Sequence, residues 1–266
     1  MNRLDKLENE SITIFREAFR KFDKTGMLWS IGKDSNVMLW LARKAFFGNV
    51  PFPLLHIDTS YKIPEMIEFR DKMAKKWDLN LIVGQNTQAI KDGMSPDNGK
   101  VNCCSALKTK GLKDLIAAHK FTGVFAGIRG DEEGTRSKER IFSPRGNEGN
   151  WDIAVQPPEF WGQFNTDFPK GTHLRIHPIL NWTELDIWRY IKRENIPVVD
   201  LYFAKNGKRF RSLGCSPCTT PIKSEAITVD EIITELEHTT EAERAGRAQD
   251  KETEDAFEKL RRDGYM

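Results

Sequence analysis

The chain has 266 residues, of which 39% are hydrophobic and 30% charged, a composition that fits a folded globular protein and excludes an intrinsically disordered one. Its 41 Lys and Arg residues and 39 Asp and Glu residues leave a formal net charge of +2, so any anion-binding site must be a local feature. No apolar run reaches the roughly 18 residues that a membrane-spanning helix needs, and the first residues are charged, so we expect a cytoplasmic protein without membrane association. Thiols stay reduced in the cytoplasm, so its four cysteines suggest metal or redox chemistry rather than disulfides.

The start of the chain predicts a helix, a strand and a second helix that follows a short polar turn. Apolar residues at helical spacing place an amphipathic helix within residues 1–24, and the apolar residues 26–29 form the end of a buried strand. Residues 30–35, Ser-Ile-Gly-Lys-Asp-Ser, lie between this strand and the next helix. Free amides and the positive end of a helix dipole meet at such a turn, so with Gly32 and Lys33 it is a candidate anion site. The alternative is a solvated turn.

Strands and helices continue to alternate, which is the pattern of a doubly wound α/β domain. Polar residues follow the apolar runs, as Asp58 and Thr59 do, and parallel strands end at the edge where open α/β sheets bind ligands. We therefore expect a mostly parallel sheet with helices on both faces over residues 1–198, a nucleotide-binding domain, and a C-terminal extension with a helical tail over residues 199–266. The later strands are expected at residues 53–59, 80–83, 123–128 and 175–179, and the helices at residues 64–77, 105–119 and 181–191.

A charged run directly after the 123–128 strand adds side chains to this edge. Arg129, Asp131 and Arg136 are nearest the strand end, so we expect them beside the polar turn. The alternative for the later residues 138–140 is a solvated helix face.

Residues 143–172 are rich in Pro, Gly, Asn and Trp, and predict a long loop that covers the site. After this loop, His177 precedes Pro178 and is expected to have a structural role. Thr183, with Asp186 three residues later, is a helix start signal.

The four cysteines form one adjacent pair, Cys103 and Cys104, and one C-x-x-C motif, Cys215 and Cys218. Four thiolates are the ligand set of a [4Fe–4S] cluster, which we expect here. A Cys₄ zinc site is the metal alternative, although adjacent cysteines are an awkward pair of ligands for one ion. The remaining alternative is four buried, inert thiols.

The polar turn resembles the S-x-G-K-D-S loop of the PP-loop ATP pyrophosphatases, and the Walker pattern is absent. Over nearly its whole length the chain resembles the adenine-nucleotide α-hydrolase superfamily, in the branch that holds the phosphoadenylylsulfate reductases and the small subunit of sulfate adenylyltransferase. The resemblance implies an ATP-using enzyme whose nucleotide lies across the carboxyl edge of the sheet. The segments that carry it are residues 30–35, 54–59, 129–140, 181–191 and 239–247.

The resemblance also implies roles for single residues. An oxyanion would attack the α-phosphorus of ATP, and the charge of the leaving pyrophosphate would be offset by Lys33, the turn amides and the arginines. Mg²⁺ would bridge phosphate oxygens, held by Asp34 or Asp131. The residues implied to bind ATP are Ser30, Gly32, Lys33, Asp34, Ser35 and, near the nucleoside, Asp58, and those implied to act at the reacting phosphate are Lys33, Asp34, Arg129, Asp131 and Arg136.

Two features depart from the sulfate adenylyltransferase small subunit. The CC…C-x-x-C layout resembles instead that of cluster-bearing sulfonucleotide reductases and of the iron–sulfur ATP pyrophosphatases of DNA phosphorothioation. Residues 201–211 pass almost directly into Gly214, where the sulfate-activating subunit carries a longer insertion. A reductase would need a further nucleophilic cysteine in its tail, and the chain has no fifth cysteine. The short connection is a basic turn with Lys205, Lys208, Arg209 and Arg211.

Two principal functions follow from these features. The first is activation of a DNA backbone phosphate, within a complex that includes a cysteine desulfurase or another sulfur-transfer subunit. The alternative is synthesis of adenylylsulfate from ATP and sulfate, with a GTPase-like large subunit. The cysteine set and the basic turn favour DNA, whereas the near-neutral charge predicts weak DNA binding by this chain alone. A regulatory nucleotide-binding subunit is a third possibility, and a homo-oligomer is compatible with each.

Overall fold

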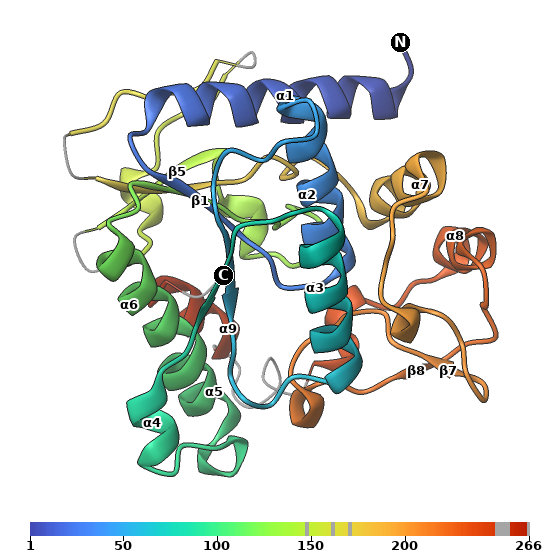
Figure 1. The fold of residues 1–266 in the computed structure, drawn as a ribbon. Helices are drawn as coiled ribbons and strands as arrows, with labels where there is room; N and C mark the ends of the chain where they lie inside the picture. The colour runs from blue at the N-terminus through green and yellow to red at the C-terminus, as the bar shows by residue number, and fades with distance from the viewer. Residues whose placement is uncertain (147–148, 161–162, 170–171, 248–255, 265–266) are drawn as a thin grey trace.

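The protein is described by a computed structural model over residues 1–146, 149–160, 163–169, 172–247 and 256–264. The centre of this described part is a six-stranded sheet in the order β3-β2-β1-β4-β6-β5 (Figure 1). Neighbouring strands are parallel except at one edge, where β5 runs antiparallel to β6. The strands are β1 Thr25–Leu28, β2 Leu54–Ile57, β3 Leu81–Gly84, β4 Gly123–Phe125, β5 Phe142–Arg145 and β6 His173–Ile176.

Helices cover both faces of the sheet, because successive strand residues point to opposite faces. On β2, Leu54 packs into the core under helices α1, α2, α3 and α7, whereas Leu55 packs with Leu112 and Leu115 of α6 on the other face. The predicted doubly wound α/β fold is confirmed. The helices are α1 Arg3–Lys21, α2 Lys33–Ala45, α3 Pro64–Lys76, α4 Thr87–Lys91, α5 Lys100–Cys103, a π-helical stretch Cys104–Thr109, α6 Lys110–His119, α7 Glu184–Glu194, α8 Val229–His238 and α9 Ala256–Arg262.

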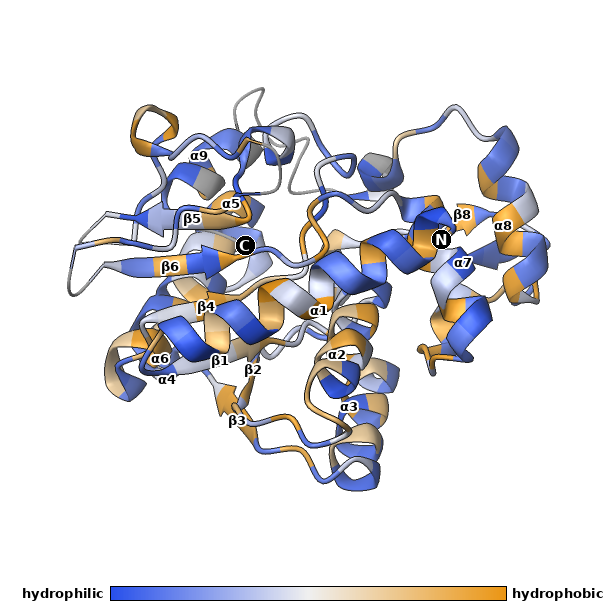
Figure 2. Ribbon diagram, turned by 90° about the horizontal axis from the view of Figure 1, so that it is seen from above, coloured by the Kyte–Doolittle hydropathy of each residue, from blue (hydrophilic) through white to orange (hydrophobic). Residues whose placement is uncertain are grey.

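Hydropathy follows this layering. Figure 2 shows strands β3 and β4 as largely hydrophobic, while α1 alternates between hydrophobic and hydrophilic residues along its length. Such alternation is typical of helices that cover a core with one side and face water with the other. Within the described ranges, no helix has both the length and the apolar character that crossing a membrane requires.

The structure corrects the prediction of a continuous loop over residues 143–172. This segment begins inside β5. Pro144 argued against a strand in the sequence, but β5 is an edge strand, where proline is tolerated. Further along, the Glu159 carboxylate accepts the backbone amides of Ile141 and Phe142, at 2.9 Å each, so this part packs against β5. None of its described residues lines the pocket described below. Residues 147–148, 161–162 and 170–171 lie outside the described part.

The C-terminal extension returns to the carboxyl edge of the sheet through short elements. The predicted basic turn is a tight turn in which Lys205 and Lys208 pair, and Asn206 and Gly207, with φ values of 53° and 73°, connect them. It leads into β7 Lys208–Arg209, which pairs with β8 Ile222–Lys223. Helix α8 follows, and then residues 239–247, before residues 248–255, which lie outside the described part.

Three histidines, of which His56 and His177 are buried and His173 is half-buried, make the stability of this fold depend on pH. His56, His173 and His177 each place Nδ1 within 3.2 Å of a backbone carbonyl oxygen. Burial lowers the pKa of His56 and His177 to about 4 and that of His173 to about 3. The value in the unfolded chain is about 6.5, so the neutral rings contribute stability above pH 6.5 that is lost as the pH falls toward 4, at up to roughly 3 kcal/mol for each ring.

We therefore expect the free energy of unfolding to fall between pH 6.5 and pH 4. His177→Asn keeps an N–H donor near the Arg140 carbonyl oxygen but cannot take up a proton in this range. In urea unfolding experiments, the slope of the free energy of unfolding against pH should therefore correspond to about one proton fewer in the variant than in the wild-type protein. An unchanged slope would show that His177 is not held in its neutral form.

Candidate active site

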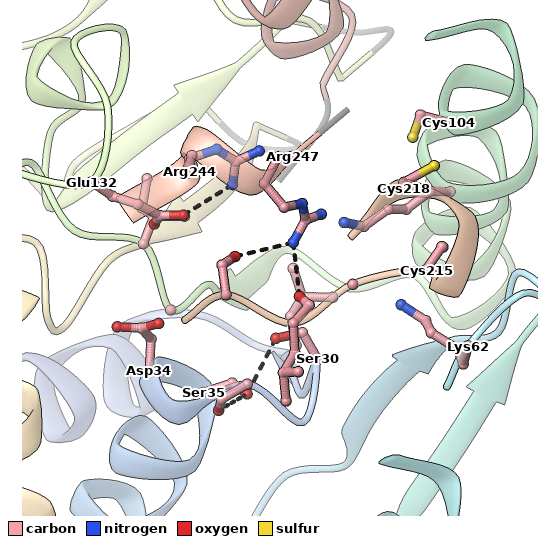
Figure 3. A pocket seen from close by; sticks show the side chains of 18 of the residues that line it. Ser30, Asp34, Ser35, Lys62, Cys104, Glu132, Cys215, Cys218, Arg244 and Arg247 are labelled. Atoms are coloured by element: carbon pink, nitrogen blue, oxygen red, sulfur yellow. Dashed lines mark hydrogen bonds and ion pairs between the residues drawn. The ribbon is translucent and has the colours of Figure 1, made fainter. Parts of the chain in front are cut away.

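A pocket opens at the carboxyl edge of the sheet, where the polar turn faces the C-terminal extension (Figure 3). This is the position at which an open α/β sheet is expected to bind its ligand. Side chains from both predicted segments, 1–198 and 199–266, form its walls, so the extension is part of the site. The lining residues fall within residues 28–35, 59–62, 103–108, 126–136, 202–218 and 243–247, together with Pro96.

The polar turn presents the N-terminus of α2 to this pocket. Ile31 has a φ of 70°, which is unusual for a β-branched residue, and its fully buried side chain anchors the turn in the core. Gly32 precedes the first residue of α2 and has no side chain with which to cap the helix. A Cβ on Gly127, just after β4, would lie 3.4 Å from the backbone of Ser35, so the strand end lies directly against the turn. This arrangement is suited to binding an anion.

Lys33 is buried, and its ammonium group lies among carboxylates. Its Nζ pairs with Glu243 and lies 3.6 Å from an oxygen of Asp34 and 3.6 Å from one of Glu184. It also donates to the carbonyl oxygen of Arg211 at 3.2 Å. Burial would lower the pKa of Lys33, but these carboxylates raise it above its ordinary value, so the ammonium group stays charged.

Arg129 lies beneath the pocket as a fully buried guanidinium. Its NH1 pairs with Asp34, its NH2 with Glu243, and its Nε donates to Asp131 at 2.9 Å. Burial opposes the charge, but Asp34 and Glu243 hold the pKa of Arg129 well above its ordinary value. The other oxygen of Asp131 accepts the amide of Glu184 at 2.8 Å, so Asp131 caps the start of α7.

Arg136 lines the pocket in an ion pair with Glu132. The same carboxylate also contacts Arg244, at 3.0 Å, as the dashed line in Figure 3 shows. Burial raises the pKa of Glu132, but Arg136 and Arg244 outweigh it and lower the pKa below its ordinary value. One carboxylate therefore holds two guanidinium groups on the pocket wall.

The four cysteines gather on another wall of the pocket, all as free thiols. Cys103 ends α5, and Cys104 begins the π-helical stretch, a feature that is frequent at functional sites. Cys215 and Cys218 flank a short turn of the extension, and Sγ of Cys215 lies 3.1 Å from the hydroxyl of Thr59. Figure 3 shows Cys104, Cys215 and Cys218 on the same side of the pocket. Burial and the three other cysteines raise the pKa of Cys103 to about 12.

The four cysteines line one part of the pocket and are the number of thiols that a [4Fe–4S] cluster or a Cys₄ zinc site takes. In the part of the chain that the structure describes, no three His, Cys, Asp or Glu side chains are arranged to hold one ion. A mononuclear Cys₄ zinc site needs four sulfurs at about 2.3 Å from one centre. In a [4Fe–4S] cluster each thiolate binds a different iron atom.

The structure brings together most of the predicted site residues. Asp58 is an exception, because its carboxylate accepts the amide of Ser60 at 2.8 Å and is absent from the described pocket lining. Asp131 is the other, since it caps α7. The predicted residues that line the pocket are Ser30, Gly32, Lys33, Asp34, Ser35 and Arg136, with Arg129 directly below and Cys103, Cys104, Cys215 and Cys218 on the second wall.

The basic turn at residues 205–211 is less basic in the structure than in the sequence. Arg209 and Arg211 are buried and paired with Glu235 and Glu184, at 2.6 Å and 2.7 Å. The two lysines of the turn remain exposed. Two of the four basic side chains of the turn are therefore exposed to solvent, which weakens its interpretation as a DNA contact.

Several residues of the site were not singled out from the sequence. The segment 239–247 carries part of the family resemblance, and its alternating Glu and Arg residues were the signal that could have identified Glu243 and Arg244. Glu184 could not be recognised, since its position after a helix cap explains an acidic residue fully. No local pattern marks Tyr202, whose hydroxyl accepts the backbone amide of Lys33 at 2.8 Å.

Comparison with known proteins identifies the family. Residues 24–221 match the model of the phosphoadenosine phosphosulfate reductase domain. Sulfate adenylyltransferase subunit 2 of Allorhizobium ampelinum is 45% identical over 294 aligned positions, which cover 99% of this chain and 93% of the relative. The protein of the same name from Psychromonas ingrahamii is 43% identical, with coverage of 100% and 98%. The 294 positions exceed the 266 residues of the chain, so the first relative contains segments that this chain lacks.

Solved structures share the fold. FMN adenylyltransferase of Candida glabrata, in complex with FMN and an ATP analogue, superposes with a TM-score of 0.57 at 17% identity, over 82% of this chain and 64% of that one. Phosphoadenylyl-sulfate reductase of Candida auris superposes with a TM-score of 0.55 at 16% identity, over 83% and 98%. At these identities the solved structures show the fold alone, whereas the family model and the near full-length relatives show the family. The chain is thus a PP-loop enzyme of the adenylyltransferase type and belongs to the phosphoadenosine phosphosulfate reductase domain family, in the branch of the sulfate adenylyltransferase small subunit.

Proposed function

We propose that this chain is the ATP-using subunit of a sulfate adenylyltransferase, which makes adenylylsulfate and pyrophosphate from ATP and sulfate. The observation that carries the proposal is the 43–45% identity, over nearly the whole chain, to proteins of that name. The pocket supports it, because a helix N-terminus and a buried, charged lysine suit the phosphates of ATP. We therefore propose sulfate, rather than a DNA phosphate, as the acceptor of the adenylyl group.

In the proposed reaction an oxygen of sulfate attacks the α-phosphorus of ATP and forms a new P–O bond. The bond from the α-phosphorus to the oxygen that bridges to the β-phosphorus breaks, and that oxygen keeps the electron pair as pyrophosphate leaves. Nothing is oxidised or reduced, so the step needs no redox partner. Negative charge grows on the leaving oxygens, and Lys33 and the turn amides would stabilise it.

The proposed roles follow the geometry. The turn from Ser30 to Ser35 would hold the β- and γ-phosphates, and Arg136 would face the reacting phosphate from the opposite wall. Arg129 would act from below by fixing Asp34, while Asp58 beside the nucleoside stays a prediction. Asp34 fits a Mg²⁺ ligand better than Asp131, because it lines the pocket and Mg²⁺ usually takes one or two carboxylates together with phosphate oxygens. Bound Mg²⁺ would neutralise part of the phosphate charge.

We also propose that Cys103, Cys104, Cys215 and Cys218 hold a [4Fe–4S] cluster, which would tie α5 to the C-terminal extension beside the pocket. Anaerobic purification should yield about four iron atoms and four sulfides for each chain. Cys218→Ser should remove most of the iron, whereas Lys33→Ala, on the other wall, should keep it. Iron at background level in the wild-type protein would remove the cluster from the account.

The name of the relatives indicates a second subunit, and we propose a GTPase-like large subunit as the partner. Activation of a DNA phosphate, with a cysteine desulfurase as sulfur donor, remains the second candidate. The gathered cysteines favour it, because the sulfate reaction itself requires no thiol and no cluster. The buried state of Arg209 and Arg211 is unfavourable to it.

The acceptor can be tested by pyrophosphate release from ATP. The chain is assayed together with a GTPase-like large subunit from the same organism under three conditions. The acceptor is sulfate in the first and duplex DNA with cysteine desulfurase in the second, and the third contains no acceptor. We expect release to rise with the sulfate concentration and to stay at background with DNA. Release that follows DNA but not sulfate would support the second candidate. ATP binding without release under any condition would contradict both and indicate a regulatory subunit.

A further inference from the structure

Residues 239–247, here called the strap, place a carboxylate against the two central cations of the phosphate site. Glu243 begins a 3₁₀ turn, Glu243–Gly246, and is buried. One of its carboxylate oxygens accepts from Nζ of Lys33 and the other from NH2 of Arg129. Burial raises the pKa of Glu243, but Arg129 and Lys33 lower it far below its ordinary value, so the group is ionised.

These cations have little capacity left for another anion. Each of the three guanidinium nitrogens of Arg129 already meets a carboxylate, and Lys33 donates to Glu243 and to a backbone carbonyl. In this cluster three cations share four carboxylates, so the positive charge that attracts a triphosphate must come from other lining residues of the pocket, such as Lys62, Arg136 and Arg247. The cations are Lys33, Arg129 and Arg211, and the carboxylates are Asp34, Asp131, Glu184 and Glu243.

A phosphate oxygen and a carboxylate oxygen compete for the same donors, because both accept charge-assisted hydrogen bonds. A phosphate on Lys33 would therefore meet the carboxylate of Glu243, and like charges repel strongly in a buried site. Asp34 and Glu184 stand in the first turns of α2 and α7, whereas Glu243 stands on the short turn of the strap. The strap is thus the element that can move away when a phosphate binds to Lys33.

The strap is held by polar contacts. Arg244 pairs with Glu132 at 3.0 Å, and Arg247 donates to the carbonyl oxygen of Leu213 at 2.8 Å. The strap backbone also forms a bridge between Arg247 and Thr219, and its carbonyl oxygens accept from the amide of Thr220, at 3.2 Å, and from NH1 of Arg211, at 2.9 Å. None of the described strap side chains belongs to the buried apolar core, and segments with few such contacts open at low cost in free energy.

We propose that Glu243 is a positioning residue that stands where the β- and γ-phosphates of ATP bind, holds Lys33 and Arg129 in place for them, and is displaced by ATP. The inference rests on the proposed function, since it takes Lys33 as a phosphate ligand. Exchange of one anion for another keeps both buried cations paired in each state, which avoids the large cost of an uncompensated buried charge. The position of the strap is then linked to the presence of the nucleotide.

Glu243→Gln tests this exchange, because it keeps the size of the side chain and removes its charge. We expect the full-length variant to bind pyrophosphate and Mg²⁺–α,β-methylene ATP roughly tenfold more tightly, and to lower KM without a matching rise in kcat. Glu184→Gln is the control, since it removes a second carboxylate charge near Lys33, at 3.6 Å, but from a helix. Its effect on affinity should be clearly smaller. Weaker binding by Glu243→Gln, or equal effects of both variants, would overturn the inference.

Hydrogen exchange of the strap amides gives the second readout. We expect exchange in the wild-type protein to become faster when the ATP analogue binds, and exchange in Glu243→Gln to be fast without it. An analogue that binds the wild-type protein but leaves strap exchange unchanged overturns this inference and spares the proposed function. Failure of the wild-type protein and both variants to bind the analogue overturns both.

Discussion

Lys33→Ala is expected to slow pyrophosphate release from ATP by roughly 1000-fold, the effect of losing a preorganised donor at the developing charge. Lys33 is the positively charged first residue of α2 and lines the pocket. The backbone amides of the turn remain in the variant, so binding of ATP should weaken less than the rate falls. The measurement is a steady-state assay of pyrophosphate release with saturating ATP and sulfate.

The same substitution should also destabilise the protein, because it leaves the carboxylates of Glu243, Asp34 and Glu184 without their shared cation. Removing one partner of a buried ion pair typically costs about 3–5 kcal/mol of unfolding free energy. The double variant Lys33→Ala/Glu243→Gln removes one of these stranded charges, so it should recover much of the stability. It should recover none of the rate, which separates the catalytic effect from the structural one.

Lys44→Ala is the matched control for both effects. Lys44 lies in the same helix and also pairs with two carboxylates, those of Glu8 and Glu194, at 2.9 Å and 3.0 Å. It lies outside the pocket lining, so its loss should leave the rate unchanged. A Lys33→Ala variant that turns over as fast as Lys44→Ala would show that the polar turn is not the catalytic one.

Arg129→Ala is expected to lower the free energy of unfolding by about 3–5 kcal/mol, since it removes one partner of the carboxylates of Asp34 and Glu243 and the arginine partner of Asp131. Asp131 also caps α7, so this helix should lose part of its support. Arg129→Lys keeps the positive charge but can contact only some of these carboxylates. Its free energy of unfolding should therefore lie between those of the wild-type protein and Arg129→Ala. Urea unfolding measures each variant.

Arg189→Ala is the control for this comparison. Arg189 pairs with Glu237 at 2.7 Å, but the two side chains are 46% and 40% exposed, so the loss should stay within roughly 1 kcal/mol. If Arg129→Ala were no more destabilising than Arg189→Ala, the buried network would not support the site in the way described.

Most of the fold could be predicted from the sequence, because it is encoded in local patterns. Apolar runs followed by polar residues marked β1 and β2, and the pair Thr183 and Asp186 marked the start of α7, where both hydrogen bonds of the capping box form. Strand β5 was missed because it is short, contains Pro144 and pairs only at an edge of the sheet. An edge strand leaves a weak signal, since one of its sides has no partner.

The candidate site could be predicted only in part, for the same physical reason. The residues of the turn at 30–35 are adjacent in the sequence, so their types alone predict an anion site. The ion pairs around it join residues far apart in the chain: Lys33 and Glu243 are separated by 210 positions, and Arg129 and Glu243 by 114. Periodicity and spacing carry no information about such pairs, which arise only when the extension folds back over the sheet edge.

A structure of the protein with Mg²⁺ and α,β-methylene ATP tests the central claim most directly. We predict that the β- and γ-phosphates lie on residues 30–35, within hydrogen-bond distance of Nζ of Lys33, and that the carboxylate of Glu243 has left that position. Phosphates bound away from this turn, with Lys33 still paired to Glu243, would contradict the account of the site.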